Sequence, residues 1–231
     1  FGKIFTTAGT MLISVVAYAF IFGWGYAVGF VALIFVHEMG HYLAARQRGL
    51  EVGAPAFIPF VGAWIQLKEQ PMNVAIEAYV AMAGPVAGTM GALICYYLAR
   101  SQNSTLLLAL AYSGFMINLF NLIPLSPLDG GRIVAILSPK IWLIGAPLLL
   151  GLFFWRPSPM LILILILALP NLLQVWRDFF GRQGSTTLEP HPLGYYEAPL
   201  ELRLQYGAGY LGLAAFLAIM CYEVSEMLPH R

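Results

Sequence analysis

The apolar residues of this chain fall into seven runs, most of them long enough to cross a bilayer as a helix. A spanning helix needs about 20 apolar residues, with a range of about 17 to 25. The run at 141–155 is short, and the last run is long enough for a seventh span or for a helix lying on the membrane surface. The pattern predicts an all-α polytopic membrane protein with about six to seven transmembrane helices. The runs cover 4–22, 26–46, 74–98, 106–123, 141–155, 160–176 and 206–224.

The composition places the chain among integral membrane proteins. Of its 231 residues, 60% are hydrophobic and 10% are charged, against roughly 25% charged in a soluble domain. The formal net charge is +1 and there is no basic stripe, so nucleic acid is not expected as a partner. Cys95 and Cys221 both lie within apolar runs, where they are expected to be small membrane hydrophobes rather than a disulfide or a metal pair.

The stretch 51–67 interrupts the helical pattern. Its glycines and prolines, Gly53, Pro55, Pro59 and Gly62, exclude a helix, and the stretch is too apolar for a solvated loop. Non-helical backbone at membrane depth needs protein cover. The stretch therefore predicts a small membrane-associated β-hairpin that is buried against the helices or dips into the membrane edge. A plain packing loop is the alternative, and the two stay open at this point.

The second run contains the motif His37-Glu38-x-x-His41. At 3.6 residues per turn the two imidazoles lie one above the other on one helical face, with Glu38 on its flank. A lone buried histidine is more often a hydrogen-bonded core residue. Here, however, two of the chain's four histidines flank a glutamate within an apolar helix, where ionisable groups are costly. The spacing predicts a zinc site with a glutamate base, about 13 Å below the charged helix end at Arg46.

Small residues form a stripe along the third run. Such a stripe lets another helix approach closely, and helix packing is its expected role, with no chemistry assigned to it. Pro85 lies within the stripe and is expected to kink the helix or to mark where it enters the membrane. The small residues are Ala83, Gly84, Ala87, Gly88 and Gly91.

The fourth run ends in a segment rich in helix breakers. Pro124 and Pro127 stop the helix and Gly130 permits a tight turn, which leaves Asp129 projecting from a broken helix end. Taken alone, Asp129 would be interpreted as a capping residue for the next helix. A catalytic zinc site, however, needs a third protein ligand and an open position. Asp178 is the only other aspartate, so Asp129 is the candidate ligand.

Basic residues near the ends of the runs predict the orientation in the membrane. With seven spans, nine of these residues fall on one side and three on the other. The side with nine is expected to be cytoplasmic, and it includes the active-site ends of the second and fourth spans. The nine are Lys3, Arg46, Arg48, Lys68, Arg132, Lys140, Arg177, Arg182 and Arg203, and the three are Arg100, Arg156 and Arg231.

Two motifs on different runs occur in a specific order. His37-Glu38-x-x-His41 is followed, about 80 residues later, by Asn121-x-x-Pro124-x-x-x-Leu128-Asp129-Gly130. Together they resemble the site-2 protease family of intramembrane zinc metalloproteases. Ala83-Gly84-Pro85-x-x-Gly88 resembles a further family feature, and Pro59-Phe60-x-Gly62-Ala63 resembles the family's membrane-embedded β-hairpin. The resemblance implies a three-helix catalytic core at 26–137.

The resemblance also implies how the chain is organised. We expect a single transmembrane metalloprotease domain over 1–231, with additional C-terminal helices at 141–224. The chain is similar to a compact bacterial-type member without an evident PDZ or CBS domain. Its implied location is the bacterial inner membrane, with the active site toward the cytoplasm.

In the catalytic site that the resemblance implies, each residue has a role. One zinc per chain would be held by His37, His41 and Asp129. Zinc would acidify a water and polarise the scissile carbonyl. Glu38 would take the proton from that water and deliver it to the leaving amine.

The implied partner is a membrane-anchored protein with a transmembrane helix, reached through the lipid bilayer. Asn121 would hydrogen-bond a substrate carbonyl or the oxyanion. Asn118, one turn earlier, could share that role, and a hydrogen bond between helices is the alternative. Segment 54–67 is expected to pair, through a strand edge, with the unwound substrate.

Two other functions are compatible with part of this pattern. One is a different membrane His-Glu-x-x-His peptidase, for example one that acts on prenylated C-termini; the segment around Asp129 argues against it. The other is a non-catalytic membrane metal-binding protein or transporter. Glu38 disfavours that function, because a site that only binds metal needs no base.

Overall fold

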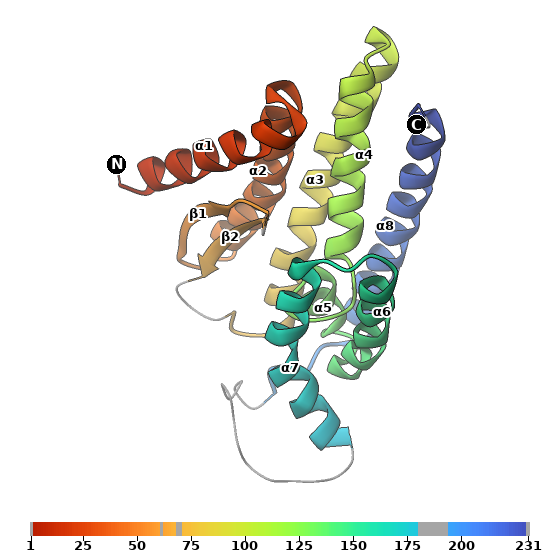
Figure 1. Ribbon diagram of the computed structural model, residues 1–231. Helices are drawn as coiled ribbons and strands as arrows, with labels where there is room; N and C mark the ends of the chain where they lie inside the picture. Colours follow the sequence, from red (N-terminus) through yellow and green to blue (C-terminus); the bar gives the residue numbers. More distant parts are fainter. Residues whose placement is uncertain (1, 61, 68–70, 180–193, 230–231) are drawn as a thin grey trace. The chain divides into compact units, whose positions relative to one another are not determined.

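Eight α-helices, one short 3₁₀-helix and one β-hairpin make up the part of the chain that the structure describes. The structure is a computed structural model, and it describes residues 2–60, 62–67, 71–179 and 194–229. The elements are α1 (Gly2–Phe22), α2 (Trp24–Gln47), β1 (Val52–Ile58), β2 (Gly62–Leu67), α3 (Val74–Gln102), α4 (Thr105–Asn121), α5 (Asp129–Val134), η1 (Pro139–Ile141), α6 (Trp142–Trp155), α7 (Pro159–Phe179) and α8 (Leu200–Met227) (Figure 1).

The chain divides into two compact units. Unit 1 consists of Phe1–Gln70, Ala83–Phe120 and Gly212–Arg231, and unit 2 of Pro71–Met82 and Asn121–Leu211. The divisions fall within helices α3 and α8 and at the last residue of α4. The expected single domain over 1–231 stays a prediction.

Within the described residues, five helices are long and apolar enough to cross a membrane. The first four are Phe5–Phe22, Trp24–Gln47, Val74–Gln102 and Pro159–Arg177, and Leu200–Met227 is the fifth. Two shorter apolar helices, Thr105–Asn121 and Pro139–Trp155, occupy the fourth and fifth predicted spans. The predicted all-α polytopic membrane fold with a small β-hairpin is confirmed.

In unit 1 an apolar cluster joins α1, α2 and β1. The ring of Tyr18 packs edge to face on Phe30 and on Phe60, with 5.0 Å between ring centroids in both pairs. The Tyr18 Oη accepts a hydrogen bond from the Phe60 N–H at 3.0 Å. This contact ties the turn of the hairpin to α1 (Figure 1). The buried members of the cluster are Tyr18, Ala27, Val31, Ile34 and Phe57.

A single glycine separates the first two helices. Gly23 has a φ of 84°, in the region that favours glycine, and α2 begins at the next residue. The Gly23 N–H still donates to the Ala19 carbonyl at 3.0 Å, and its own carbonyl accepts from Ala27 at 3.1 Å. The chain can therefore change direction here without leaving these backbone groups unpaired.

The predicted β-hairpin at 51–67 is confirmed as two antiparallel strands, and α1 covers one edge of it. Thr7 Oγ1 donates to the Pro55 carbonyl at 2.8 Å, and the Phe57 N–H donates to Thr10 Oγ1 at 3.2 Å. The backbone groups of Pro55 and Phe57 therefore point away from β2. In an antiparallel ladder, residues opposite such positions also point their N–H groups outward. Those residues are Ile65 and Ala63, so the far edge of β2 presents their N–H groups.

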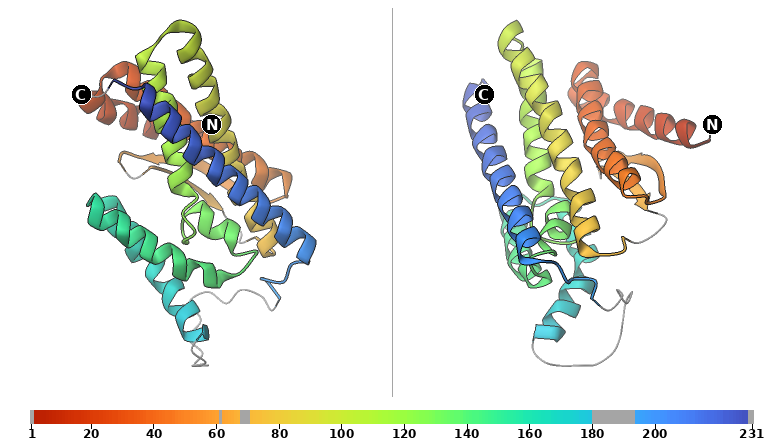
Figure 2. Two further views of the ribbon diagram at one scale, coloured as in Figure 1. Left: turned by 90° about the vertical axis from the view of Figure 1, so that its right-hand side faces the viewer. Right: turned by 180° about the vertical axis from the view of Figure 1, so that it is seen from behind.

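Helix α3 runs without interruption from Val74 to Gln102, through Pro85. The proline neither ends the helix nor lies in its first turn. The expected kink or membrane entry at Pro85 stays a prediction. Thr89 Oγ1 donates to the Pro85 carbonyl at 2.6 Å, which keeps a buried hydroxyl satisfied inside the helix. In unit 1 this helix lies beside α4, because a Cβ on Gly114 would come within 2.9 Å of the Ala92 side chain (Figure 2).

In unit 2, α6 and α7 lie side by side (Figure 2) and both contact the segment between α4 and α5. A Cβ on Gly145 would collide with the Pro124 carbonyl, so the backbone of α6 lies directly against this segment. From α7, Asn171 Nδ2 donates to Ser126 Oγ at 3.1 Å. The prolines break α4 as predicted, and the helices that follow hold the broken segment.

Candidate metal centre

The two histidines of α2 present ring nitrogens to the same point. His37 Nε2 and His41 Nε2 are 3.0 Å apart, and the ring planes meet at 79°. His37 is buried, with 4% of its surface exposed, and His41 is half-buried. The predicted stacking of positions i and i+4 on one helical face is therefore realised in unit 1.

The hydrogen bonds around His37 determine which of its nitrogens can bind a metal. Asn118 Nδ2 donates to the Gly114 carbonyl at 2.7 Å, so Asn118 Oδ1 faces the ring. His37 Nδ1 lies 2.8 Å from that oxygen and must be the donor. With the proton on Nδ1, the lone pair is on Nε2, the nitrogen that faces His41. Hydrogen bonding of the remote nitrogen is what orients a metal-ligating histidine in known sites.

This arrangement bears on the role considered for Asn118. The side chain is 2% exposed, and both ends of its amide bond protein groups. It makes the hydrogen bond between helices that was the alternative, linking α4 to α2 and orienting His37. A part for Asn118 in substrate binding stays a prediction.

The small residues of α3 lie directly against this site, a role that sequence reasoning missed. A Cβ on Gly40 of α2 would collide with the Ala83 carbonyl of α3. A Cβ on Gly84 would collide with the His41 ring, and a Cβ on Gly88 would collide with the Asn118 amide. The small residues of α3 therefore leave room for the His41 imidazole and the Asn118 amide, in addition to allowing close helix packing. The family-like Ala83-Gly84-Pro85-x-x-Gly88 motif was the signal that could have shown this.

The residues present fit zinc. Two nitrogens that each lie about 2.0–2.1 Å from one tetrahedral zinc are about 3.3–3.4 Å apart, close to the observed 3.0 Å between the histidines. Neutral imidazole is a common zinc ligand, and the Asn118 contact supplies the outer-shell bond. Glu38 lies next to His37 on α2 and is 8% exposed. A carboxylate is therefore buried beside the imidazole pair.

Asp129 and Asn121 belong to unit 2. Asp129 is the first residue of α5 and is 8% exposed, and Asn121 is the last residue of α4 and is half-buried. The predicted break between them is a tightly folded turn. A Cβ on Gly130 would collide with the Leu122 carbonyl, and a Cβ on Gly131 would collide with the backbone at Ser126.

Three side chains from later elements bond the segment between Asn121 and Arg132. Tyr210 Oη on α8 donates to the Leu122 carbonyl at 2.6 Å. Trp142 Nε1 on α6 donates to the Gly131 carbonyl at 2.8 Å, and Asn171 on α7 reaches Ser126 as described above. The backbone that precedes and follows Asp129 is therefore fixed from several directions.

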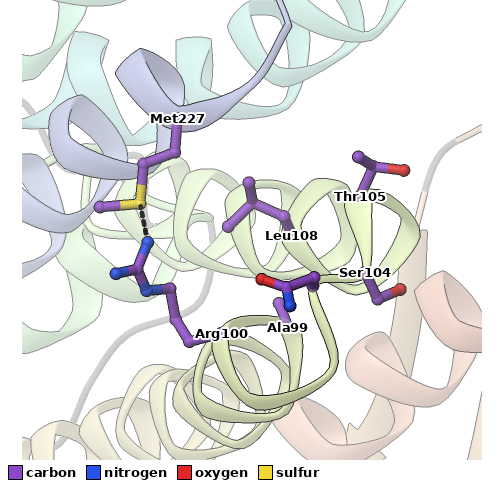
Figure 3. Close-up of a pocket in the computed structure, with 7 residues that line it drawn as sticks. Ala99, Arg100, Ser104, Thr105, Leu108 and Met227 are labelled. Atoms are coloured by element: carbon purple, nitrogen blue, oxygen red, sulfur yellow. Dashed lines mark hydrogen bonds between the residues drawn. The ribbon is translucent and has the colours of Figure 1, made fainter.

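The other two histidines of the chain, His191 and His230, fall outside the described residues. A concavity of about 190 Å³ lies at the turn between α3 and α4, where Arg100 Nη1 donates to Met227 Sδ at 3.9 Å (Figure 3). Its lining contains no histidine or carboxylate, and Arg100 is about 24 Å along α3 from Gly84. This concavity is separate from the imidazole pair.

Comparison with known proteins bears on the segment that contains the motif and the hairpin. Residues 25–103 match the family model described as peptidase family M50. These residues are similar to family M50 and form the M50 segment of the chain. The M50 segment contains His37, Glu38 and His41, whereas Asp129 lies beyond it. The resemblance to the site-2 protease family is confirmed.

Named relatives agree with the M50 assignment. Rip3 of Mycobacterium tuberculosis, which is named as a zinc metalloprotease, is 31% identical over 121 residues, covering 48% of this chain and 30% of Rip3. Zinc metalloprotease MJ0392 of Methanocaldococcus jannaschii is 32% identical over 124 residues, covering 50% of this chain and 36% of the relative. The chain thus spans about a third of the length of these relatives.

A solved structure is also similar to this chain. The site-2 protease from Methanocaldococcus jannaschii is 22% identical, with a TM-score of 0.46. The alignment covers 78% of this chain and 89% of that structure.

The role of Gly84 gives a direct test. In Gly84→Ala the new methyl group would displace the His41 ring, so we expect zinc affinity to fall at least about tenfold. Alanine favours a helix over glycine by about 1 kcal/mol, so a loss of binding cannot be attributed to helix propensity. Gly212→Ala on α8 is the matched control, because no atom lies within 4 Å of its added Cβ. Competition with a chromogenic chelator measures the affinity, and equal affinities of the two variants would contradict the assignment.

Proposed function

We propose that this chain is an intramembrane zinc metalloprotease that hydrolyses peptide bonds within or near the transmembrane segments of membrane-anchored proteins. The observation that supports it best is the imidazole pair of His37 and His41, which converges beside Glu38 on a helix long enough to span a bilayer. The M50 segment and the names of the relatives support the reaction class. Removal of membrane-anchored regulators by such cleavage is the wider role that we infer.

In this proposal Asp129 joins His37 and His41 as a ligand of one zinc ion per chain. Two nitrogens and one carboxylate oxygen leave a fourth position open, as a catalytic zinc site requires. When bound, zinc supplies a Lewis acid that acidifies a water and polarises the scissile carbonyl. The fixed turn around Asp129 supports this role, because a ligand on an anchored backbone loses little freedom when it binds.

The protein groups perform the proton transfers and the positioning. Glu38 takes a proton from the attacking water and returns it to the leaving amine. Burial of this carboxylate keeps competing water away from it. Asn121, at the end of α4, donates its amide N–H to a substrate carbonyl or to the developing oxyanion.

The substrate in this proposal is a single membrane helix that unwinds near the metal. A helical peptide bond is shielded, and each backbone hydrogen bond lost in a membrane costs several kcal/mol unless it is replaced. The outer edge of β2 carries the N–H groups of Ala63 and Ile65. It can replace the lost hydrogen bonds by pairing with the unwound, extended substrate. We place the site toward the cytoplasmic face of a bacterial inner membrane, on the basis of the positive-inside rule.

The metal content tests the ligand set. We expect purified protein to hold one zinc per chain. His37→Ala, His41→Ala and Asp129→Ala should each lower the occupancy, because each removes one of three protein ligands. Asp178→Ala, which removes the other aspartate, is the control and should keep zinc. Metal analysis by mass spectrometry measures the occupancy, and full occupancy in Asp129→Ala would exclude that residue from the site.

The base is tested by Glu38→Gln, which keeps the shape of the side chain but cannot accept the proton. Zinc should stay bound while the cleavage rate falls at least about a hundredfold. The assay is cleavage of a model membrane substrate by protein reconstituted in lipid. Cleavage at a rate near that of the wild type would rule out this mechanism, and zinc binding without any cleavage by the wild type would favour a metal-binding protein.

Pairing with the β2 edge is tested with proline. Ala63→Pro and Ile65→Pro remove an outward N–H, and proline is tolerated on an edge strand. We expect both variants to lose cleavage and to keep zinc. Ala63→Val and Ile65→Val, which keep the N–H, should cleave at rates near that of the wild type. If the proline variants cleave as fast as the valine variants, the hairpin has only a packing role.

A further inference from the structure

Three side chains that are distant in sequence form a charged cluster in unit 2. Arg132 Nε on α5 donates to Glu77 Oε1 on α3 at 3.1 Å. The other carboxylate oxygen, Glu77 Oε2, accepts a hydrogen bond from Tyr195 Oη at 2.7 Å. Tyr195 is 4% exposed, and its carbonyl accepts from the Val74 N–H at 3.0 Å. Glu77 is thus fixed on both oxygens, and the tyrosine that fixes it is itself anchored to the start of α3.

The tyrosine is a stable donor in this cluster. Burial, and then the negative charge of Glu77, raise the pKa of Tyr195 above its usual range. The hydroxyl therefore keeps its proton at any physiological pH. It holds the carboxylate in the position from which Glu77 meets Arg132.

The position of Arg132 along α5 gives this cluster a consequence for Asp129. The two residues are three apart on one short helix, and side chains at i and i+3 are neighbours on a helix surface. Asp129 also acts electrostatically on the Arg132 charge. Guanidinium is a strong bidentate partner for carboxylate. The Arg132 side chain can therefore compete with a metal ion for the oxygens of Asp129.

We propose that Glu77, held by Tyr195, is a positioning residue for the third zinc ligand, because it engages the Arg132 guanidinium and so keeps this guanidinium from competing with the metal for the Asp129 carboxylate. This inference rests on the proposed function, in which Asp129 binds zinc. It assigns a role to the start of α3 and to the residues before α8, neither of which belongs to a catalytic motif.

The test measures the zinc affinity of the full chain in lipid. Glu77→Gln keeps the size of the side chain but removes its charge, so Arg132 should turn to Asp129. We expect the zinc affinity to fall at least about tenfold. Tyr195→Phe, which removes only the hydroxyl, should shift the affinity in the same direction by a smaller factor. Glu201→Gln, an exposed glutamate of α8, is the matched control and should have no effect.

Replacement of Arg132 distinguishes the positioning role of Glu77 from a purely structural one. Arg132→Gln alone should hold zinc within about threefold of the wild type, and the double variant Glu77→Gln/Arg132→Gln should recover to the same level. Cobalt-substituted protein gives a second readout, because its visible absorption changes when a carboxylate leaves the metal. An ion pair that only stabilises the fold would make Arg132→Gln at least as harmful as Glu77→Gln, with no recovery in the double variant, and this result would overturn the inference.

Failure of the inference can be told apart from failure of the proposed function. If Asp129→Ala keeps full zinc, the ligand assignment itself is wrong. If Asp129→Ala loses zinc but Glu77→Gln binds it as tightly as the wild type does, the ligand assignment stands and Glu77 is not a positioning residue.

Discussion

The close approach of α2 and α3 at Gly40 and Gly84 is the constraint on which the candidate metal centre depends. Water does not drive helices together in a bilayer, so their contact relies on van der Waals packing and on small residues that let backbones approach. Here the same residues also leave room for an imidazole, because a side chain at position 84 would occupy the volume of the His41 ring. The same small residues are therefore required both for close helix packing and for the space that the His41 ring occupies.

A second constraint is the cost of polar groups at membrane depth. The His37 imidazole is buried, and its remote nitrogen bonds the Asn118 amide, which in turn bonds the Gly114 carbonyl. Tyr26 Oη and Ser113 Oγ make another bond between α2 and α4, at 2.6 Å. Each bond satisfies a group that the hydrocarbon could not, and together they restrict rotation of α2 about its axis. The orientation of the metal-binding face follows from these polar contacts as much as from apolar packing.

Unit 2 shows why helices beyond the catalytic motifs matter. Prolines and glycines free the turn that contains Asp129 from helical hydrogen bonding, which leaves carbonyls such as that of Leu122 to be satisfied by other elements. Tyr210 and Trp142 supply those bonds from α8 and α6. From the sequence alone, the helices at 141–224 are expected only as additions to the catalytic core. In unit 2 they hold the backbone around Asp129 in place.

The sequence by itself determined the membrane class, the sequence ranges of most helices and the histidine pair, whereas it left a hairpin and a packing loop open for 51–67. These features follow from local properties: run length, turn residues, and a spacing of four that places two side chains on one helical face. Only the tertiary structure decided what the polar and small residues do. The sequence left open whether Asn118 bonds another helix or a substrate, and Gly84 and Gly88 looked like packing positions. Their roles depend on which side chain of another helix lies opposite, and helical periodicity contains no information about that. For the same reason the pairing of Glu77 with Arg132 and Tyr195 could not be predicted, because the fold brings together side chains that are 55 and 118 residues apart in the chain.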